Sequence, residues 1–257
     1  MVVQVSDRPR RAVAAAALVL LLGAAGCGGS TPEETAPAAS GIENPVDPAT
    51  AGRITGKVGF EGTAPSPQVV KTATDPRCTA PVMTEEVVLG TGNTLQNVFV
   101  YVKDGLGNRV FPVPTTPVVL GQEGCAYRPR VLGIQVGQTL DILNSDDTLH
   151  NIHAIPERNG EFNKAQAMKG ARNTHVFNTT EVMVPFKCDV HRWMTAYVGV
   201  VDHPFHAVTG SDGTFTLEGL PPGTYTIEAV HETLGRQTVS VTLPEKGAQD
   251  ITFTFKA

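Results

Sequence analysis

The sequence contains few charged and aromatic residues. Of its 257 residues, 18% are charged and 6% are aromatic, and Trp occurs once. The formal net charge of −5 leaves no basic surface to replace the counterions of DNA or RNA, which excludes nucleic acid as a partner. No segment keeps a helical period for more than about two turns, which excludes a helical bundle. Gly and Pro are frequent instead, at 26 and 19 residues, and indicate a chain with many turns.

Residues 1–26 have the layout of an export signal. Three arginines precede an apolar run at 12–25, which is too short for a transmembrane helix and ends in small residues before Cys27. This layout resembles a bacterial lipoprotein signal in which Cys27 is lipidated, and an ordinary secretory signal is the alternative. We expect an exported protein of the bacterial cell envelope, held on a membrane by the lipid at Cys27. Residues 27–52 are rich in Pro, Ala, Ser and Glu and predict a flexible tether.

The remaining chain has an all-β pattern. Short β-branched or alternating runs are separated by Gly, Pro, Asn and Asp, which predicts a sandwich or barrel. The pattern leaves room for one short helix at 162–170. The predicted strands are ITGKVGF, LQNVFVYV, RVLGIQV, TLDILN, EVMVPFKC, AYVGVV, TFTLEGL, TYTIEAV, QTVSVTL and ITFTFK.

The other three cysteines divide into a pair and a single thiol. Cys78 and Cys125 lie in polar, turn-like surroundings of an exported chain, so we expect a disulfide between them. Closing this loop would stabilise the fold by ~4 kcal/mol in the loop-entropy account. Cys188 is then left without a partner, and a free thiol in an oxidising compartment needs an explanation.

The residues near Cys188 in the sequence offer an explanation for its free thiol. In the predicted strand 182–188, alternation places Cys188 on the apolar face, at the strand end. His191 and Met194 follow at intervals of three, and an upstream strand, with Leu140 and Ile142 inward, leads into a loop that carries His150.

One thiolate, two imidazoles and a weak thioether are the ligands of a blue-copper centre. We therefore predict one mononuclear type 1 copper ion held by His150, Cys188, His191 and Met194. His153 competes with His150, and because residues three apart on an extended chain face opposite ways, we expect only one of the two to reach the metal.

The segments HNIH and FKCDVHRWM resemble the cupredoxins, and amicyanin in particular, over about residues 131–202. The resemblance implies a Greek-key sandwich that carries one-electron chemistry for a redox partner protein. It also implies the same four ligands, with Asn151 joining the two ligand segments by hydrogen bonds. His191 and its apolar surroundings would then form the electron-exit face. We assign 53–202 to this copper domain, with extra N-terminal strands.

The C-terminal residues 203–257 resemble the carboxypeptidase regulatory-like (transthyretin-like) β-sandwich modules of exported proteins. The turns Ser-Asp-Gly at 211–213 and Pro-Pro-Gly at 221–223 separate its strands. About 50 residues are short for a complete module, which leaves room for a strand borrowed from its neighbour. No HExxH motif of zinc peptidases occurs.

Three functions fit these features: a membrane-tethered electron carrier, a copper storage or delivery protein, and a metal-free envelope or adhesion module. Storage proteins usually have Met-rich or His-rich tracts, which five Met do not provide. Multicopper enzymes have His-x-His pairs, and a binuclear purple centre needs two cysteines in the ligand loop, but this sequence has neither. We therefore expect an electron carrier and not an enzyme.

Overall fold

A computed structural model describes residues 45–72 and 74–257. The predicted signal peptide 1–26, Cys27 and the tether up to residue 44 lie outside the described residues. The described residues form sixteen strands in four sheets, and they include no helix that could cross a membrane. The all-β fold predicted from the sequence is confirmed.

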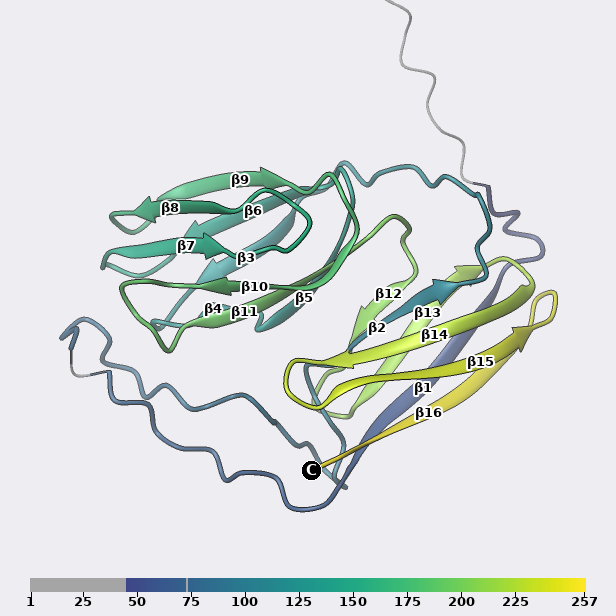
Figure 1. Cartoon of the computed structure of the whole chain (residues 1–257), viewed down its shortest axis with the longest axis horizontal. Helices are drawn as coiled ribbons and strands as arrows, with labels where there is room; N and C mark the ends of the chain where they lie inside the picture. The colour runs from purple at the N-terminus through teal and green to yellow at the C-terminus, as the bar shows by residue number, and fades with distance from the viewer. Residues whose placement is uncertain (1–44, 73) are drawn as a thin grey trace, which may run out of the picture. The chain divides into compact units, whose positions relative to one another are not determined.

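The strands follow one another along the chain as shown in Figure 1. They are β1 (Gly52–Glu61), β2 (Phe99–Asp104), β3 (Val118–Gln122), β4 (Tyr127–Arg128), β5 (Val131–Gln135), β6 (Thr139–Asn144), β7 (His150–Ala154), β8 (Phe162–Gln166), β9 (Arg172–Val176), β10 (Glu181–Lys187), β11 (Thr195–Val201), β12 (His206–Val208), β13 (Thr214–Leu220), β14 (Gly223–His231), β15 (Gly235–Leu243) and β16 (Ala248–Lys256).

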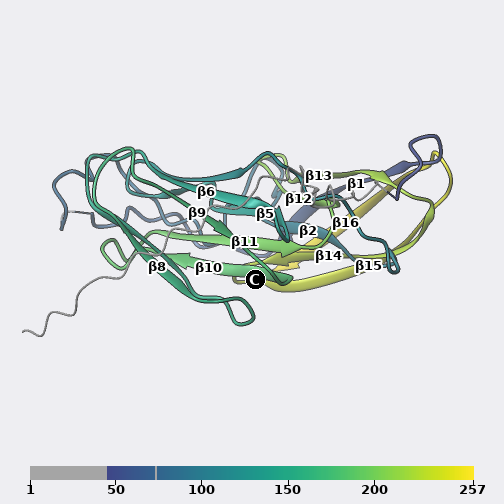
Figure 2. The same cartoon turned by 90° about the horizontal axis from the view of Figure 1, so that it is seen from above.

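The first sandwich, made by β3 to β11, contains the predicted copper ligands. One sheet has the order β4-β3-β6-β9 and the other β5-β11-β10-β7-β8; Figure 2 shows β6 beside β9. The apolar faces of the two sheets share one buried cluster, which includes Leu140 and Ile142 as predicted, together with Cys188 and Met194. The ligand loop is therefore anchored in this core.

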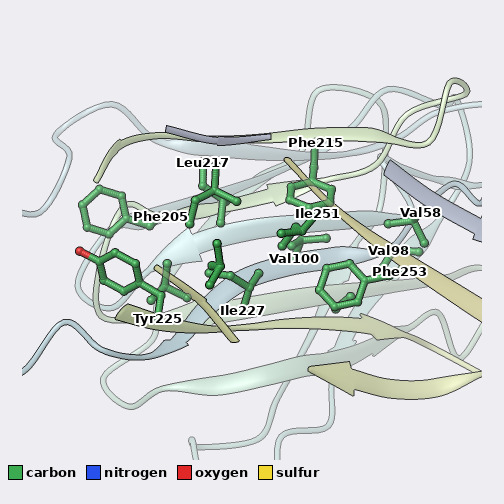
Figure 3. Packing of buried hydrophobic residues seen from close by; sticks show 14 of the residues in the cluster. Val58, Val98, Val100, Phe205, Phe215, Leu217, Tyr225, Ile227, Ile251 and Phe253 are labelled. Carbon is green, nitrogen blue, oxygen red and sulfur yellow. The ribbon is translucent and has the colours of Figure 1, made fainter. Parts of the chain in front are cut away.

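The second sandwich combines both ends of the described chain. Its sheets have the orders β13-β1-β16 and β12-β2-β14-β15. Figure 3 shows aromatic and aliphatic side chains from both sheets filling the space between them, among them Phe215 and Phe253. The buried alternation along β13, β14 and β16 explains why these sequences are strands.

The predicted division at residue 203 differs from this arrangement. β1 pairs with β13 and, in parallel, with β16, while β2 pairs with β12 and β14. The N-terminal strands therefore belong to the second sandwich, and the first sandwich is inserted between β2 and β12. The physical reason is that the C-terminal strands are too few for two covered sheets, so the module borrows two strands and not only one.

Three smaller expectations also change. Residues 162–170 form β8 and a turn instead of a helix. The end of the predicted tether is structured, because residues 47–51 form a turn and Val46 packs against the second core. Strict alternation along 182–188 would place Val182 and Val184 on the same face as Cys188, but Met183 adopts a left-handed φ of 68° at a bulge in β10, so Val182 packs in a different apolar cluster from Val184.

Candidate metal centre

The ligand loop 188–194 joins the antiparallel neighbours β10 and β11. The N–H of Cys188 donates to the carbonyl of Met194 at 3.3 Å, and the N–H of Met194 donates to the carbonyl of His191 at 2.9 Å. All three residues are 1% exposed. The prediction that Cys188 shares the inward face of its strand is confirmed, because Val184 and Phe186 are also buried.

His150 approaches the loop from the next strand. We expected it on a loop, but it is the first residue of β7, which pairs with β8 and β10, and it is fully buried. His153 leaves the same strand toward solvent, where it binds Asp189 and Glu161 at 3.0 and 2.9 Å. The structure therefore brings His150, and not His153, to the donor atoms of Cys188 and His191.

Three donor atoms meet in the core. Nδ1 of His150 lies 2.9 Å from Nδ1 of His191, and Sγ of Cys188 lies 3.9 Å from the same atom. The ligand atoms of the three residues all lie within 4.8 Å of one another. Such separations fit a single ion, because metal bonds to imidazole nitrogen and thiolate sulfur are roughly 2.0–2.3 Å long.

Each of the two histidines has a carboxylate oxygen next to its Nε2. Nε2 of His150 lies 2.8 Å from Oδ2 of Asp146, and Nε2 of His191 lies 3.0 Å from Oδ2 of Asp75. A carboxylate in this position fixes the proton on Nε2 and leaves the Nδ1 lone pair for an ion. Burial lowers the pKa of His150, against the opposing effect of Asp146, which favours the neutral ring that a metal requires.

The sulfur of Cys188 also has two donors. The backbone N–H groups of Asn151 and His191 each point to Sγ at 3.4 Å, and such bonds tune a metal bound by thiolate. The Asn151 side chain donates to Oδ2 of Asp189 at 3.0 Å and accepts the N–H of Asp189. Asn151 therefore joins β7 to the ligand loop by the kind of contact that the sequence predicted.

Met194 and Trp193 form the wall of the site. Met194 lies in the same buried cluster as Cys188, and a thioether is the weak fourth ligand of a blue-copper centre. The Trp193 ring lies 5.0 Å from the His191 ring, centroid to centroid, and its Nε1–H donates to the carbonyl of Cys125 at 2.9 Å. These contacts make Trp193 a packing residue.

A segment from outside the sandwich covers His191. Cys78 and Cys125 form a disulfide, and Sγ of Cys78 lies 3.7 Å from Nε2 of His191. Asp75, in the turn before Cys78, binds the same nitrogen. Because His191 is only 1% exposed, the expectation that its edge forms an electron-exit face is wrong.

The sequence reading missed both carboxylates. Asp146 lies four residues before His150, in the run NSDDTLH. An acidic residue so close in the sequence could have indicated a carboxylate partner for His150. Asp75 is 116 residues from His191 and has no local signal. It lies in the turn before Cys78, which the disulfide links to the first sandwich.

Residues 195–256 match the carboxypeptidase regulatory-like domain. The match begins at the first residue of β11, whereas the second sandwich lacks β11 and also uses β1 and β2. No curated protein matches the chain.

Several solved structures are similar to part of the chain. A copper-containing nitrite reductase (NirK) from Thermus scotoductus SA-01 is 20% identical, with a TM-score of 0.33, over 39% of this chain and 26% of that chain. A purple cupredoxin from Nitrosopumilus maritimus is 26% identical, with a TM-score of 0.29, over 32% of this chain and 98% of that chain. A reduced amicyanin mutant is 23% identical, with a TM-score of 0.30, over 34% of this chain and 85% of that chain.

The chain thus combines the sandwich that contains the candidate metal site with a second sandwich that includes most of the carboxypeptidase regulatory-like match. It spans about a quarter of the nitrite reductase.

Proposed function

We propose that the protein is a type 1 copper protein that carries single electrons in the bacterial cell envelope. The observation that supports this most is the convergence of the donor atoms of His150, Cys188 and His191 in a buried site beside Met194. Soft sulfur suits Cu(I) and imidazole suits both oxidation states. Copper bound there would supply one-electron oxidation and reduction.

The chain's own residues would hold the ion in one arrangement through the redox change. β7, β10 and β11 fix the ligands on paired strands, and the backbone N–H groups of Asn151 and His191 stabilise charge on the Cys188 sulfur. The ligands are buried, so water and a substrate have no direct approach to them. This enclosure favours an electron carrier over an enzyme.

Location and partners follow from the sequence and are part of the proposal. A lipid at Cys27 would hold the protein on a membrane, and the 78–125 disulfide suits an oxidising compartment. Electrons would be exchanged with a redox partner protein. Copper storage or delivery is the main alternative, and it would require the buried ligands to open.

The test is the visible spectrum of the chain from residue 27, titrated with Cu(II), with Cys27→Ser so that Cys188 is the single free thiol. We expect an intense thiolate-to-copper band that saturates at about one equivalent. Cys188→Ser should abolish the band while the fold survives, and the matched control His153→Ala should keep it.

Other outcomes would contradict the proposal. A band that survives in Cys188→Ser would exclude the ligand assignment. Copper bound tightly without an intense band would favour storage or delivery, and no binding would leave a metal-free envelope module.

A further inference from the structure

The turn before Cys78 holds a carboxylate against His191. Oδ2 of Asp75 accepts the Thr148 hydroxyl at 2.6 Å as well as facing Nε2 of His191, and Oδ1 accepts the N–H of Arg77 at 2.9 Å. The N–H of Cys78 donates to the carbonyl of Asp75 at 3.1 Å. These three hydrogen bonds hold the Asp75 side chain and its turn in place. Its position is therefore fixed relative to the disulfide.

The turn at Cys125 holds a second carboxylate, that of Asp146, against His150. The N–H groups of Gly124 and Cys125 donate at 2.8 Å to the two oxygens of Asp146, whose Oδ2 also faces Nε2 of His150. Gly124 and Cys125 both have left-handed φ values, 62° and 56°. This conformation is unfavourable for Cys and is found where structure around it requires it. Here it aims two consecutive N–H groups at one carboxylate.

Each half-cystine thus lies in a turn that positions a carboxylate, and each carboxylate contacts Nε2 of one of the two histidines of the site. We propose that the 78–125 disulfide is a clamp that, through the positioning residues Asp75 and Asp146, holds His191 and His150 with Nδ1 facing the metal site and closes the site beside His191. This inference rests on the proposed metal function but concerns the chain's own residues. It gives the disulfide a role in the site beyond loop closure.

The local structure explains why the disulfide is needed. The described residues between β1 and β2 form turns and isolated bridges, among them Val69 with Met83 and Leu89 with Leu95. No strand of this described segment holds the turn of Asp75 against the first sandwich. A dithiol reductant that converts the disulfide to two thiols would release this turn and uncover His191, which links the metal site to the thiol redox state of the compartment.

The first test uses metal-free protein and does not depend on copper. Diethyl pyrocarbonate labelling, read by peptide mass mapping, reports the accessibility of each histidine. In the intact chain we expect His191 to react at least ten-fold more slowly than His153. Asp75→Ala, which keeps the disulfide, and the double variant Cys78→Ser, Cys125→Ser should each accelerate labelling of His191 about ten-fold. Asp212→Asn, an exposed carboxylate of the second sandwich, is the matched control and should change nothing.

Equal labelling of His191 in Asp75→Ala and the intact chain would overturn the clamp, even if the double variant fails to fold. With copper bound, removing the negative charge behind either histidine makes it a poorer donor to Cu(II). Asp75→Asn and Asp146→Asn should therefore raise the reduction potential, and Asp212→Asn should not. Absence of the intense copper band in the intact chain would refute the proposed function, while the labelling result would still decide the clamp.

Discussion

Met194 is the proposed ligand whose substitution would separate metal binding from the tuning of the reduction potential. Its thioether is buried with Cys188, and a weak axial donor of this kind sets the reduction potential without providing most of the affinity. Met194→Gln replaces sulfur with a harder oxygen donor, which stabilises Cu(II) relative to Cu(I). We expect the copper and its colour to remain and the reduction potential, measured by voltammetry, to fall.

Met168→Gln is the control for this change, because Met168 is 65% exposed and lies outside the ligand loop. Its potential should equal that of the intact chain. A potential that also stays constant in Met194→Gln would show that Met194 is not the axial ligand.

For single residues, the sequence predicts contacts between residues that are close to one another in the chain. Cys188, His191 and Met194 lie within one loop, so their spacing alone indicates a shared site. The carboxylate of Asp75 has no such signal, because its contact with His191 depends on a disulfide and on the path of a segment without strands. The burial of His191 was mispredicted for the same reason.

Among the elements, β1 is the strand on which the second sandwich depends. It lies between β13 and β16, and a Cβ added at Gly56 would come within 2.2 Å of the Ile251 carbonyl and 2.5 Å of the Phe215 ring. Gly56→Ala should therefore lower the free energy of unfolding by about 1–3 kcal/mol, as overpacking does in other cores. Urea unfolding would measure this loss.

Gly160→Ala is the matched control, because nothing lies within 4 Å of a Cβ at that position. A surface change of this kind usually alters stability by less than about 0.5 kcal/mol. Equal midpoints for the two variants would mean that β1 is not tightly held between its neighbours.

Each of the ten strand sequences read from alternation and turn residues contains a strand, although only the second half of LQNVFVYV lies in β2. Six strands were missed, and each has five residues or fewer, which leaves little alternation to read: β3, β4, β7, β8, β9 and β12. Membership of β1 was also wrong, because it pairs with β16 nearly two hundred residues later. Alternation shows that a segment is a strand, but it does not identify the distant strand with which that segment pairs.

Across the whole molecule, the two sandwiches share contacts as well as chain connections. A small apolar cluster joins Phe99 and Val230 of the second sandwich to Val131 and Val201 of the first. Next to it, the Arg130 guanidinium donates twice to Glu232, at 2.6 and 2.8 Å, with both side chains largely buried. Breaking such a pair leaves a buried charge without a partner. Stability of the two sandwiches is therefore coupled at this contact.

Acid should destabilise the molecule near the contact between the two sandwiches. Burial lowers the pKa of His206 and His231 from 6.5 to about 4, and the charge of Arg130 adds to the effect at His231. The folded chain keeps these rings neutral where the unfolded chain protonates them. Their contribution is thus fully present above pH 6.5 and is lost as the pH falls to about 4. For His231 the loss is at most roughly 3 kcal/mol.

His231→Asn tests this window, because an amide oxygen can replace the Nδ1 that accepts the N–H groups of Thr233 and Leu234. Urea unfolding between pH 7 and 4 should show a smaller decline than in the intact chain. His153→Asn is the control of opposite sign, since Asp189 and Glu161 raise the pKa of His153 and its contribution is lost as the pH rises. Equal declines in His231→Asn and the intact chain would contradict the prediction. Carboxylates such as Asp189 could not explain such a decline, because a pKa lowered from 3.8 to about 2 acts only below this window.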